Sequence, residues 1–122
     1  MTEREAPFAY SGLDRVFHER ARLGIVTSLA GHADGLGFSE LKALCGLTDG
    51  NLARHLQVLE EAGFVDIEKT GEGSRPLTRC KLTSKGRVRF AEYLTVLEEV
   101  LRQGARVCEA GPSSRSLRTR TV

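Results

Sequence analysis

The stretch SELKALCGLTDGNLARHLQVLEEAG, residues Ser39–Gly63, carries the pattern that decides the fold. Its second half repeats a leucine every three or four positions, at Leu52, Leu56 and Leu59. That spacing places the three leucines on one face of a helix. A shorter helical segment precedes it, and about three residues around Gly46 separate the two segments. Two helices joined by so short a turn are typical of a helix-turn-helix unit.

Residues within this stretch also predict where its helices begin. Ser39 is the expected N-cap of a first helix over Glu40–Cys45, with Leu41 and Leu44 facing inward. Thr48 is the expected N-cap of the second helix, which ends at the glycine that closes the stretch. The free backbone N–H groups beside Thr48 favour a phosphate at this helix end.

A β-hairpin is predicted directly after the second helix. Two runs with strand-like composition, Phe64–Lys69 and Thr78–Leu82, flank the turn-forming residues TGEGSRPL. The hairpin is basic, and Lys69, Arg75 and Arg79 are expected to meet phosphates or to enter the minor groove. A helix-turn-helix followed by such a hairpin is the winged-helix arrangement.

Helices are also predicted on both sides of this unit. The pattern from Leu13 to Ala30 is helical, but its apolar residues change face halfway, so we expect its first half to meet a second copy of the chain. A last helix, capped by Thr83, carries apolar residues in alternating steps of four and three, as a coiled-coil seam does, although single amphipathic helices share this pattern. The residues predicted to form a dimer interface are Leu13, Val16, Phe17, Phe90, Tyr93, Leu94, Leu97 and Leu101.

The outward face of the second helix of the stretch carries the candidate DNA-reading residues. With the leucines inward, Asn51, Arg54 and Gln57 point outward, and His55 lies at the edge of the buried face. Asn and Gln amides pair with adenine in the major groove, and Arg pairs with guanine. The same residues also suit an ordinary solvated helix face. The short helix before them and the basic hairpin after them favour DNA.

Length and charge are consistent with a small regulator. The chain has 122 residues and a net charge of +2, enough for one domain with a modest core. We expect a flexible lead-in over residues 1–11, a winged-helix domain with dimerisation helices over 12–110, and a disordered basic tail over 111–122. An apolar run long enough to span a membrane is absent, and the N-terminus has no apolar signal region, so a cytoplasmic protein is expected.

The cysteines and the remaining polar residues point to no catalytic or metal site. Cys45, Cys80 and Cys108 are far apart and odd in number, which argues against a disulfide framework or a zinc site. Cys45 is expected in the core. Cys80 lies between Arg79 and Lys81, and its pKa would be lowered if the thiol were exposed, which leaves a thiol-gated sensor as one alternative. No catalytic grouping or phosphate loop is recognisable, so we expect no enzyme, no cofactor and no metal.

The stretches LTDGNLARHLQVLEEAGFV and KLTSKGR resemble the small winged-helix regulators related to the MarR and ArsR types, and the resemblance extends over about Leu13 to Leu101. It implies an α+β, mainly α, winged helix-turn-helix with long flanking helices that form the dimer interface. It also implies a homodimeric, sequence-specific regulator of transcription, a repressor, that binds double-stranded DNA. By this resemblance DNA contacts fall on Ser39, Thr48, Asn51, Arg54, His55, Lys69, Ser74 and Arg75.

Two departures and one alternative accompany this resemblance. Metal sensors of the ArsR type often carry paired cysteines on the first helix of the helix-turn-helix, whereas this chain has only Cys45 there, so metal sensing by that route is not expected. Larger proteins of the MarR type hold a ligand pocket between their DNA-binding and dimer regions by means of longer terminal helices. This chain is short, so the resemblance does not imply a roomy effector pocket, and the sequence identifies no effector. The alternative function is a winged-helix module that binds other proteins and no specific DNA.

Overall fold

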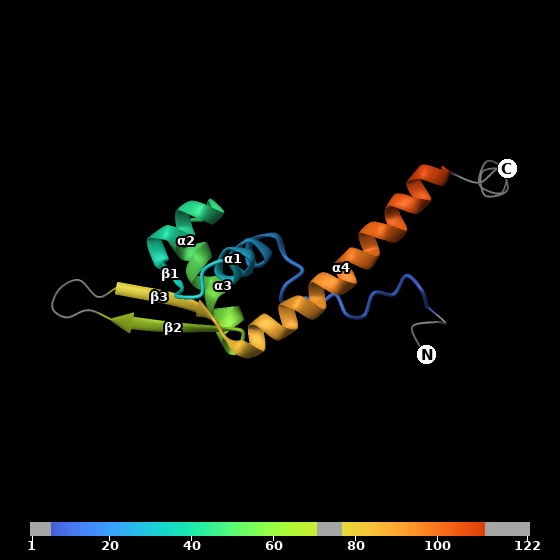
Figure 1. Cartoon of the computed structure of the whole chain (residues 1–122). Coiled ribbons are helices and arrows are strands. Elements are labelled where there is room, and N and C mark those ends of the chain that lie inside the picture. The colour runs from blue at the N-terminus through green and yellow to red at the C-terminus, as the bar shows by residue number, and fades with distance from the viewer. Residues whose placement is uncertain (1–5, 71–76, 112–122) are drawn as a thin grey trace.

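The computed structural model describes residues 6–70 and 77–111 of the chain. Helices α1, α2 and α3 form a cluster beside a small sheet, and α4 extends away from it with the N-terminal segment alongside (Figure 1). The elements, in chain order, are α1 (Arg20–Ala30), β1 (Leu36–Gly37), α2 (Phe38–Cys45), α3 (Asp49–Glu61), β2 (Val65–Thr70), β3 (Leu77–Leu82) and α4 (Ser84–Ala110).

The helix-turn-helix lies where the sequence predicts it, with two corrections in its first helix. Helix α2 begins at Phe38, and its N-cap is Gly37 instead of Ser39, because the Glu40 carboxylate accepts the Gly37 N–H at 2.8 Å. Leu41 is fully buried, but Leu44 is 61% exposed, since only one face of this short helix meets the core. Gly46 ends α2 in the left-handed conformation, as expected of a C-cap glycine.

The predicted hairpin is confirmed and gains a third strand. The sheet is antiparallel with the order β1-β3-β2, and Leu36 of β1 pairs with Cys80 of β3. Gly35, just before β1, has φ +86°, and a Cβ there would lie 2.5 Å from the Cys80 carbonyl oxygen. Glycine is required at this position because only glycine fits so close an approach, which lets the two-residue strand β1 pair with β3.

The predicted first helix is wrong in its N-terminal half. Residues 13–19 form turns, and α1 begins at Arg20 with Glu19 as its N-cap. This turn directs Phe17 into the core, where its ring stacks on Phe64 with the centroids 4.7 Å apart. The change of apolar face that suggested one helix serving two partners reflects an irregular segment followed by a helix.

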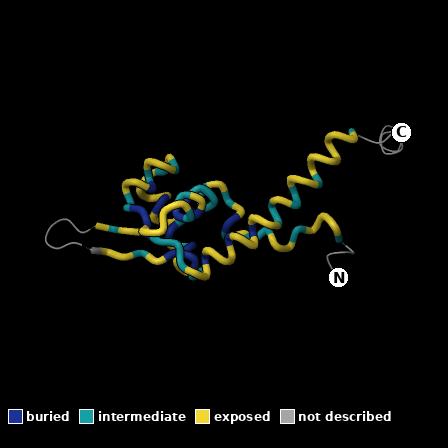
Figure 2. The backbone as a smooth tube through the Cα atoms, viewed as in Figure 1, coloured by how far each residue is buried: buried dark blue, intermediate teal, exposed yellow. Residues whose placement is uncertain are grey.

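Three residues assigned to the dimer interface belong to the chain's own core. Phe17, Phe90 and Tyr93 are buried, and the centroids of Phe90 and Tyr93 lie 5.3 and 5.6 Å from that of Phe17. Leu97, one turn beyond Tyr93, is partly buried against this core, and exposed residues predominate along the C-terminal half of α4 (Figure 2). Leu94 and Leu101, also predicted for the interface, are 44% and 66% exposed.

Within the described residues, none of the helices combines the length and the apolar character that crossing a membrane requires. The buried apolar side chains form one cluster between α1, α3, the sheet and the start of α4, made of Phe17, Ile25, Val26, Leu29, Leu36, Leu41, Leu52, Leu56, Leu59, Phe64, Val65, Cys80, Phe90 and Tyr93.

Candidate nucleic-acid interface

Helix α3 presents a polar face to solvent because its apolar face is completely used by the core. Leu52, Leu56 and Leu59 are buried on one side, as predicted. On the other side Asn51 and Arg54 are exposed and adjacent, and Arg54 Nη2 donates to Asn51 Oδ1 at 3.2 Å. The two side chains thus form one polar patch one turn from the start of the helix.

Two local contacts are made at the beginning of α3. The Thr48 hydroxyl accepts the Asn51 N–H at 3.2 Å, which confirms Thr48 as the N-cap. Lys42 of α2 forms an ion pair with Asp49 in the first turn of α3, at 2.8 Å. This exposed pair spans the turn between the two helices. Gln57, two turns along, is exposed and donates to Glu61 at 3.4 Å.

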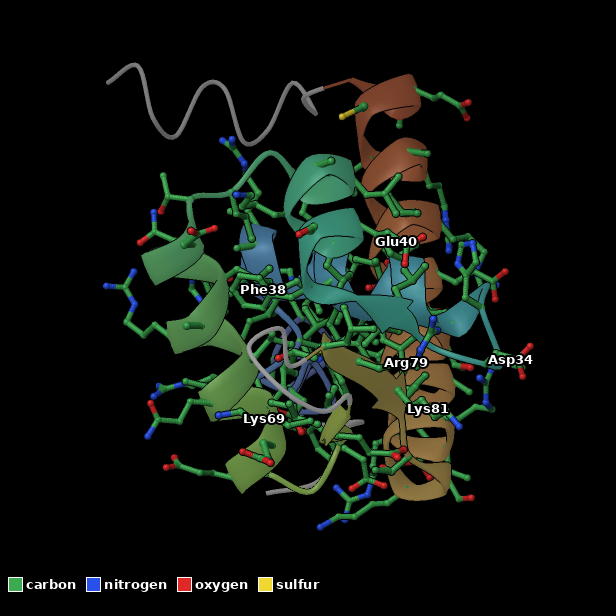
Figure 3. The ribbon with its side chains drawn as sticks, turned by 90° about the vertical axis from the view of Figure 1, so that its left-hand side faces the viewer. Asp34, Phe38, Glu40, Lys69, Arg79 and Lys81 are labelled. Atoms are coloured by element: carbon green, nitrogen blue, oxygen red, sulfur yellow. The ribbon has the colours of Figure 1, made fainter. Side chains whose placement is uncertain are left out.

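Strand register separates the basic residues of the hairpin onto two faces. Lys69 pairs with Thr78, and two positions earlier Ile67 pairs with the buried Cys80, so Lys69 shares the core-facing side of the sheet. Arg79 pairs with Glu68 and therefore lies on the opposite side. Figure 3 shows Lys69 on the side of α3, and Arg79 and Lys81 on the side of Asp34.

Arg79, an expected DNA contact, is exposed and makes hydrogen bonds within its own chain. Its guanidinium Nη1 donates to the carbonyl oxygens of Asp34 and Gly35, at 3.1 and 3.0 Å. These bonds hold β3 against the segment that leads into β1. Alternation along the strand places Arg79 on the face away from α3. Ser74 and Arg75, the other predicted wing contacts, lie outside the described residues.

The first turn of α2 contributes a second surface near the hairpin. Ser39 is exposed there, and it lines a shallow groove between this turn and the beginning of β3. The groove also includes Phe38 and the exposed Leu77. Ser39, predicted as a DNA contact, is therefore accessible although it does not cap the helix.

His55 lies between α3 and α1 instead of on the outer face of α3. Its side chain is only 12% exposed, and its Nδ1 lies 3.1 Å from Arg22 Nη1. Glu19 Oε1 is 3.8 Å from the same nitrogen. The expected position at the edge of the buried face is correct, and the ring is engaged with α1. Sequence reasoning did not identify Arg22, whose role depends on a contact between segments distant in the chain.

The cysteines behave differently from one another. Cys80 is fully buried in β3, and burial together with the nearby Glu60 carboxylate raises the pKa of its thiol from about 9 to about 11. The condition for a lowered pKa, an exposed Cys80 thiol, is therefore not met. Cys45 is half-buried against the core, and Cys108 is exposed on α4. In the part of the chain that the structure describes, groups of three or more potential metal ligands do not occur.

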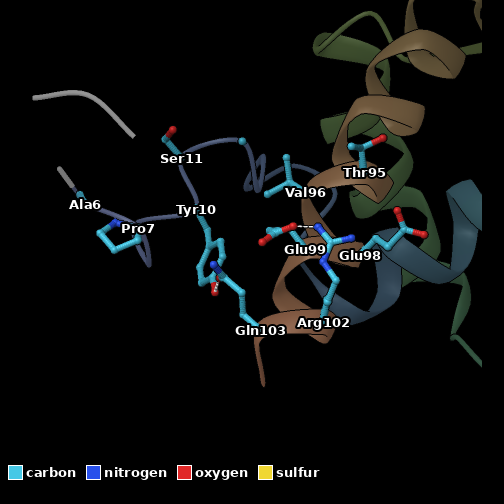
Figure 4. Close-up of a pocket in the computed structure, with 11 residues that line it drawn as sticks. Ala6, Pro7, Tyr10, Ser11, Thr95, Val96, Glu98, Glu99, Arg102 and Gln103 are labelled. Atoms are coloured by element: carbon cyan, nitrogen blue, oxygen red, sulfur yellow. Dashed lines mark hydrogen bonds and ion pairs between the residues drawn. The ribbon is translucent and has the colours of Figure 1, made fainter. Parts of the chain in front are cut away.

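A cleft of about 540 Å³ separates the N-terminal segment from α4 (Figure 4). Tyr10 of the N-terminal segment donates a hydrogen bond to Gln103 of α4, and Arg102 pairs with Glu99 within α4. This cleft lies along α4, whereas the polar patch described above lies on α3. The two features thus belong to different parts of the molecule.

Comparison with known proteins agrees with this geometry. A family model described as a winged helix DNA-binding domain matches residues 21–101. The chain is 41% identical over 80 residues to an uncharacterized protein of Methanocaldococcus jannaschii, and the match covers 66% of this chain and 86% of that protein.

Solved structures give the same fold. A transcriptional regulator homologue protein from Pyrococcus horikoshii is 28% identical with a TM-score of 0.67, over 82% of this chain and 93% of the other. MepR of S. aureus, solved in a complex with DNA, is 15% identical with a TM-score of 0.64, over 85% and 84% of the two chains. MarR is 23% identical with a TM-score of 0.62, over 79% and 70%. The predicted mainly helical winged-helix fold and the resemblance to MarR-type proteins are confirmed.

Proposed function

Because this chain belongs to the family of winged helix DNA-binding domains, we propose that it is a transcriptional regulator that binds a specific double-stranded DNA site as a homodimer and represses transcription. The observation that carries the proposal is the exposed polar patch of Asn51 and Arg54, which lies beside the N-cap of α3. A helix in this position of a helix-turn-helix enters the major groove by its N-terminal residues.

In the proposed complex, the first two turns of α3 read base edges. Arg54 offers a fork of donors that matches guanine, and Asn51 and Gln57 carry amides suited to adenine. Thr48 lies at the helix N-terminus, where backbone N–H groups and the helix dipole attract a phosphate.

Contacts from outside α3 are proposed to be phosphate contacts. Lys69, on the α3 side of the sheet, and the exposed Ser39, in the first turn of α2, are proposed to flank the groove that α3 enters. Ser74 and Arg75 are proposed as wing contacts on the strength of the family resemblance. Phosphate contacts position a protein on the duplex without reading its sequence.

The proposed dimer rests on the apolar face of α4 beyond the domain. Leu94 and Leu101 are exposed and lie seven residues apart, on one face of α4 beyond the last buried residue, Tyr93. Single exposed leucines are common, but a continuous stripe at coiled-coil spacing is typical of a helix–helix contact. Two copies related by a two-fold axis would present two α3 helices to half-sites about one helical turn apart.

The test of DNA reading is selection of sites from random duplex DNA, followed by affinity measurements on the selected site. Arg54→Ala should weaken specific binding by about tenfold or more, since a bidentate arginine–guanine contact contributes about 1–3 kcal/mol. Arg106→Ala is the matched control, because Arg106 is an exposed arginine on α4. If no sequence is enriched, or if both variants bind as the parent does, α3 does not read DNA.

Separate experiments test the proposed dimer and the proposed repression of transcription. Leu94→Asp combined with Leu101→Asp should convert the dimer to a monomer in analytical ultracentrifugation and should weaken binding to a two-half-site duplex more than to a single half-site. In a transcription assay with the selected site placed over a promoter, added protein should lower transcript yield. An increase would contradict repression while leaving DNA binding intact.

A further inference from the structure

Arg22 connects three segments of the chain through one guanidinium group. Its side chain is 17% exposed, and it extends from α1 toward the turns that precede this helix. The Nε donates to the Val16 carbonyl oxygen at 2.7 Å, and Nη2 donates to the Arg15 carbonyl oxygen at 3.4 Å. The Nη1 lies 3.1 Å from Nδ1 of His55 on α3. One side chain thus links residues 15–16, α1 and α3.

The chemistry of the pair selects one state of the histidine. A guanidinium only donates and stays charged, so Nδ1 of His55 must accept and the ring must be neutral, with its proton on Nε2. Glu19 balances the arginine, with Oε1 4.0 Å from Arg22 Nη1, and it also caps α1 by accepting the Arg22 N–H. Burial alone would raise the pKa of Glu19, but this backbone bond and the charge of Arg22 lower it, so the carboxylate is favoured.

The two ends of this connection have different surroundings. Residues 15–16 continue the N-terminal segment, which lies against α4, where a Cβ on Gly12 would be 2.6 Å from Val96 Cγ2. His55 directly follows Arg54, the residue of α3 proposed to read guanine. A shift of the N-terminal segment along α4 would therefore move the carbonyl groups of residues 15 and 16, to which Arg22 donates. Arg22 in turn contacts His55 of α3.

We propose that Arg22 and His55 are a positioning pair that sets the orientation of α3 relative to residues 15–16. Those two residues follow the N-terminal segment, residues 6–12, which lies against α4. His55 then acts through Nδ1 toward the protein and not through Nε2 toward DNA, which corrects its expected role as a DNA contact. This inference rests on the proposed function, because orientation of α3 matters only if α3 reads DNA. The pair couples the part of the chain that lies on α4 to the DNA-reading patch.

Three substitutions of His55 separate positioning from DNA contact. In His55→Asn the amide oxygen takes the place of Nδ1 and still accepts from Arg22, whereas His55→Gln places its amide near Nε2, and His55→Leu has neither group. Dissociation constants are measured for the selected site and for a random duplex of equal length. His55→Asn should stay within about threefold of the parent, and the other two should lose about tenfold on the selected site only, about the effect of one hydrogen bond to a charged group.

The reverse order overturns the proposal. If His55→Gln retains specific affinity and His55→Asn loses it, the ring contacts DNA through Nε2. If all three variants match the parent, the pair does not position α3. Loss of affinity for both duplexes alike would indicate general unfolding, and thermal melts of each variant identify that case. A double-mutant cycle with Arg22→Met should show strong non-additivity with His55→Leu, and additive losses would contradict a pair.

A DNA-independent measurement distinguishes failure of the pair from failure of the proposed function. The ¹⁵N NMR signals of the His55 ring should report a single neutral tautomer with the proton on Nε2 in the parent and a mixture in Arg22→Met. Unchanged signals in that variant would refute the pair whether or not the protein binds DNA. A single tautomer that Arg22→Met disrupts, in a protein that selects no duplex, would refute the proposed function and with it the role of the pair in DNA reading.

Discussion

Helices α3 and α4 have the same kind of sequence and opposite relations to the rest of the chain. Both begin with a threonine cap and repeat apolar residues at helical spacing. In α3 all three leucines of the repeat are buried by the chain itself, whereas in α4 burial stops at Tyr93 and Leu101 is 66% exposed. A complete apolar face leaves α3 only its polar side for a ligand. The apolar residues that α4 leaves exposed are the ones proposed to contact a second copy of the chain.

The largest expected difference between the two helices concerns one identical substitution. Leu52→Ala in α3 should lower the free energy of unfolding by about 2–5 kcal/mol, because it opens a cavity in the core. Leu101→Ala in α4 should cost the isolated chain under about 0.5 kcal/mol, because its side chain is mostly in water. Urea unfolding at low protein concentration measures both values. Equal losses would show that the comparison of the two helices is mistaken.

Glycines in the first turns of the two helices provide a second contrast. A Cβ on Gly86 of α4 would lie 2.2 Å from the Phe64 carbonyl oxygen, which already accepts the Thr83 N–H at 2.9 Å and so is not free to move. Gly86→Ala should therefore destabilise by about 1–3 kcal/mol or more. Gly50 of α3 has open space around it, and Gly50→Ala should be neutral or stabilising by up to about 1 kcal/mol. Thermal unfolding of both variants checks the sign at each position.

The threonine caps should differ by a smaller amount. The Thr48 hydroxyl accepts one N–H at 3.2 Å, whereas the Thr83 hydroxyl accepts the Gly86 N–H at 2.8 Å and also donates to the Gly63 carbonyl oxygen at 2.7 Å. Thr48→Ala should cost about 1 kcal/mol and Thr83→Ala about 2 kcal/mol. Serine at either position, which keeps the hydroxyl, should restore most of the loss in chemical denaturation. A larger loss at Thr48 would mean that its surroundings contribute more than the cap bond.

The smallest effect concerns the thiols and their pH dependence. Because the folded pKa of Cys80 is raised from about 9 to about 11, its contribution to stability is complete below pH 9 and is lost as the pH rises from 9 toward 11. Cys80→Val should remove this part of the alkaline decline in stability relative to the parent. In the native protein at pH 8, a thiol reagent should modify the exposed Cys108 and leave Cys80 intact. Modification of native Cys80 at a comparable rate would contradict its burial.

Local patterns predicted the helix-turn-helix and the hairpin correctly because their signals are short in range. Leucine spacing located α3, and threonine caps located the beginnings of α3 and α4. The errors arose where a distant segment decided the outcome. Phe17 resembled part of an amphipathic helix, but the rings of Phe64, Phe90 and Tyr93 surround it in the core. The two-residue strand β1 exists only because β3 pairs with it.

The candidate site also contains residues that the sequence identified and residues that it did not. Outward spacing on one helix was enough to identify Asn51, Arg54 and Gln57, since a helix has a fixed period. The roles of Arg79 and His55 were not predictable, because each is set by a partner from another part of the chain: the Asp34 and Gly35 carbonyl groups for Arg79, and Arg22 for His55.

The sequence by itself determined where α3, the hairpin of β2 and β3, and α4 lie, and which face of α3 is polar, because these features depend on spacing and on capping within a few residues. Only the tertiary structure decided which apolar residues the chain buries for itself and which it leaves exposed on α4. That outcome depends on contacts among residues far apart in the chain, whose geometry local spacing does not encode. For the same physical reason Phe17, Phe90 and Tyr93 became core, while Leu94 and Leu101 stayed at the surface.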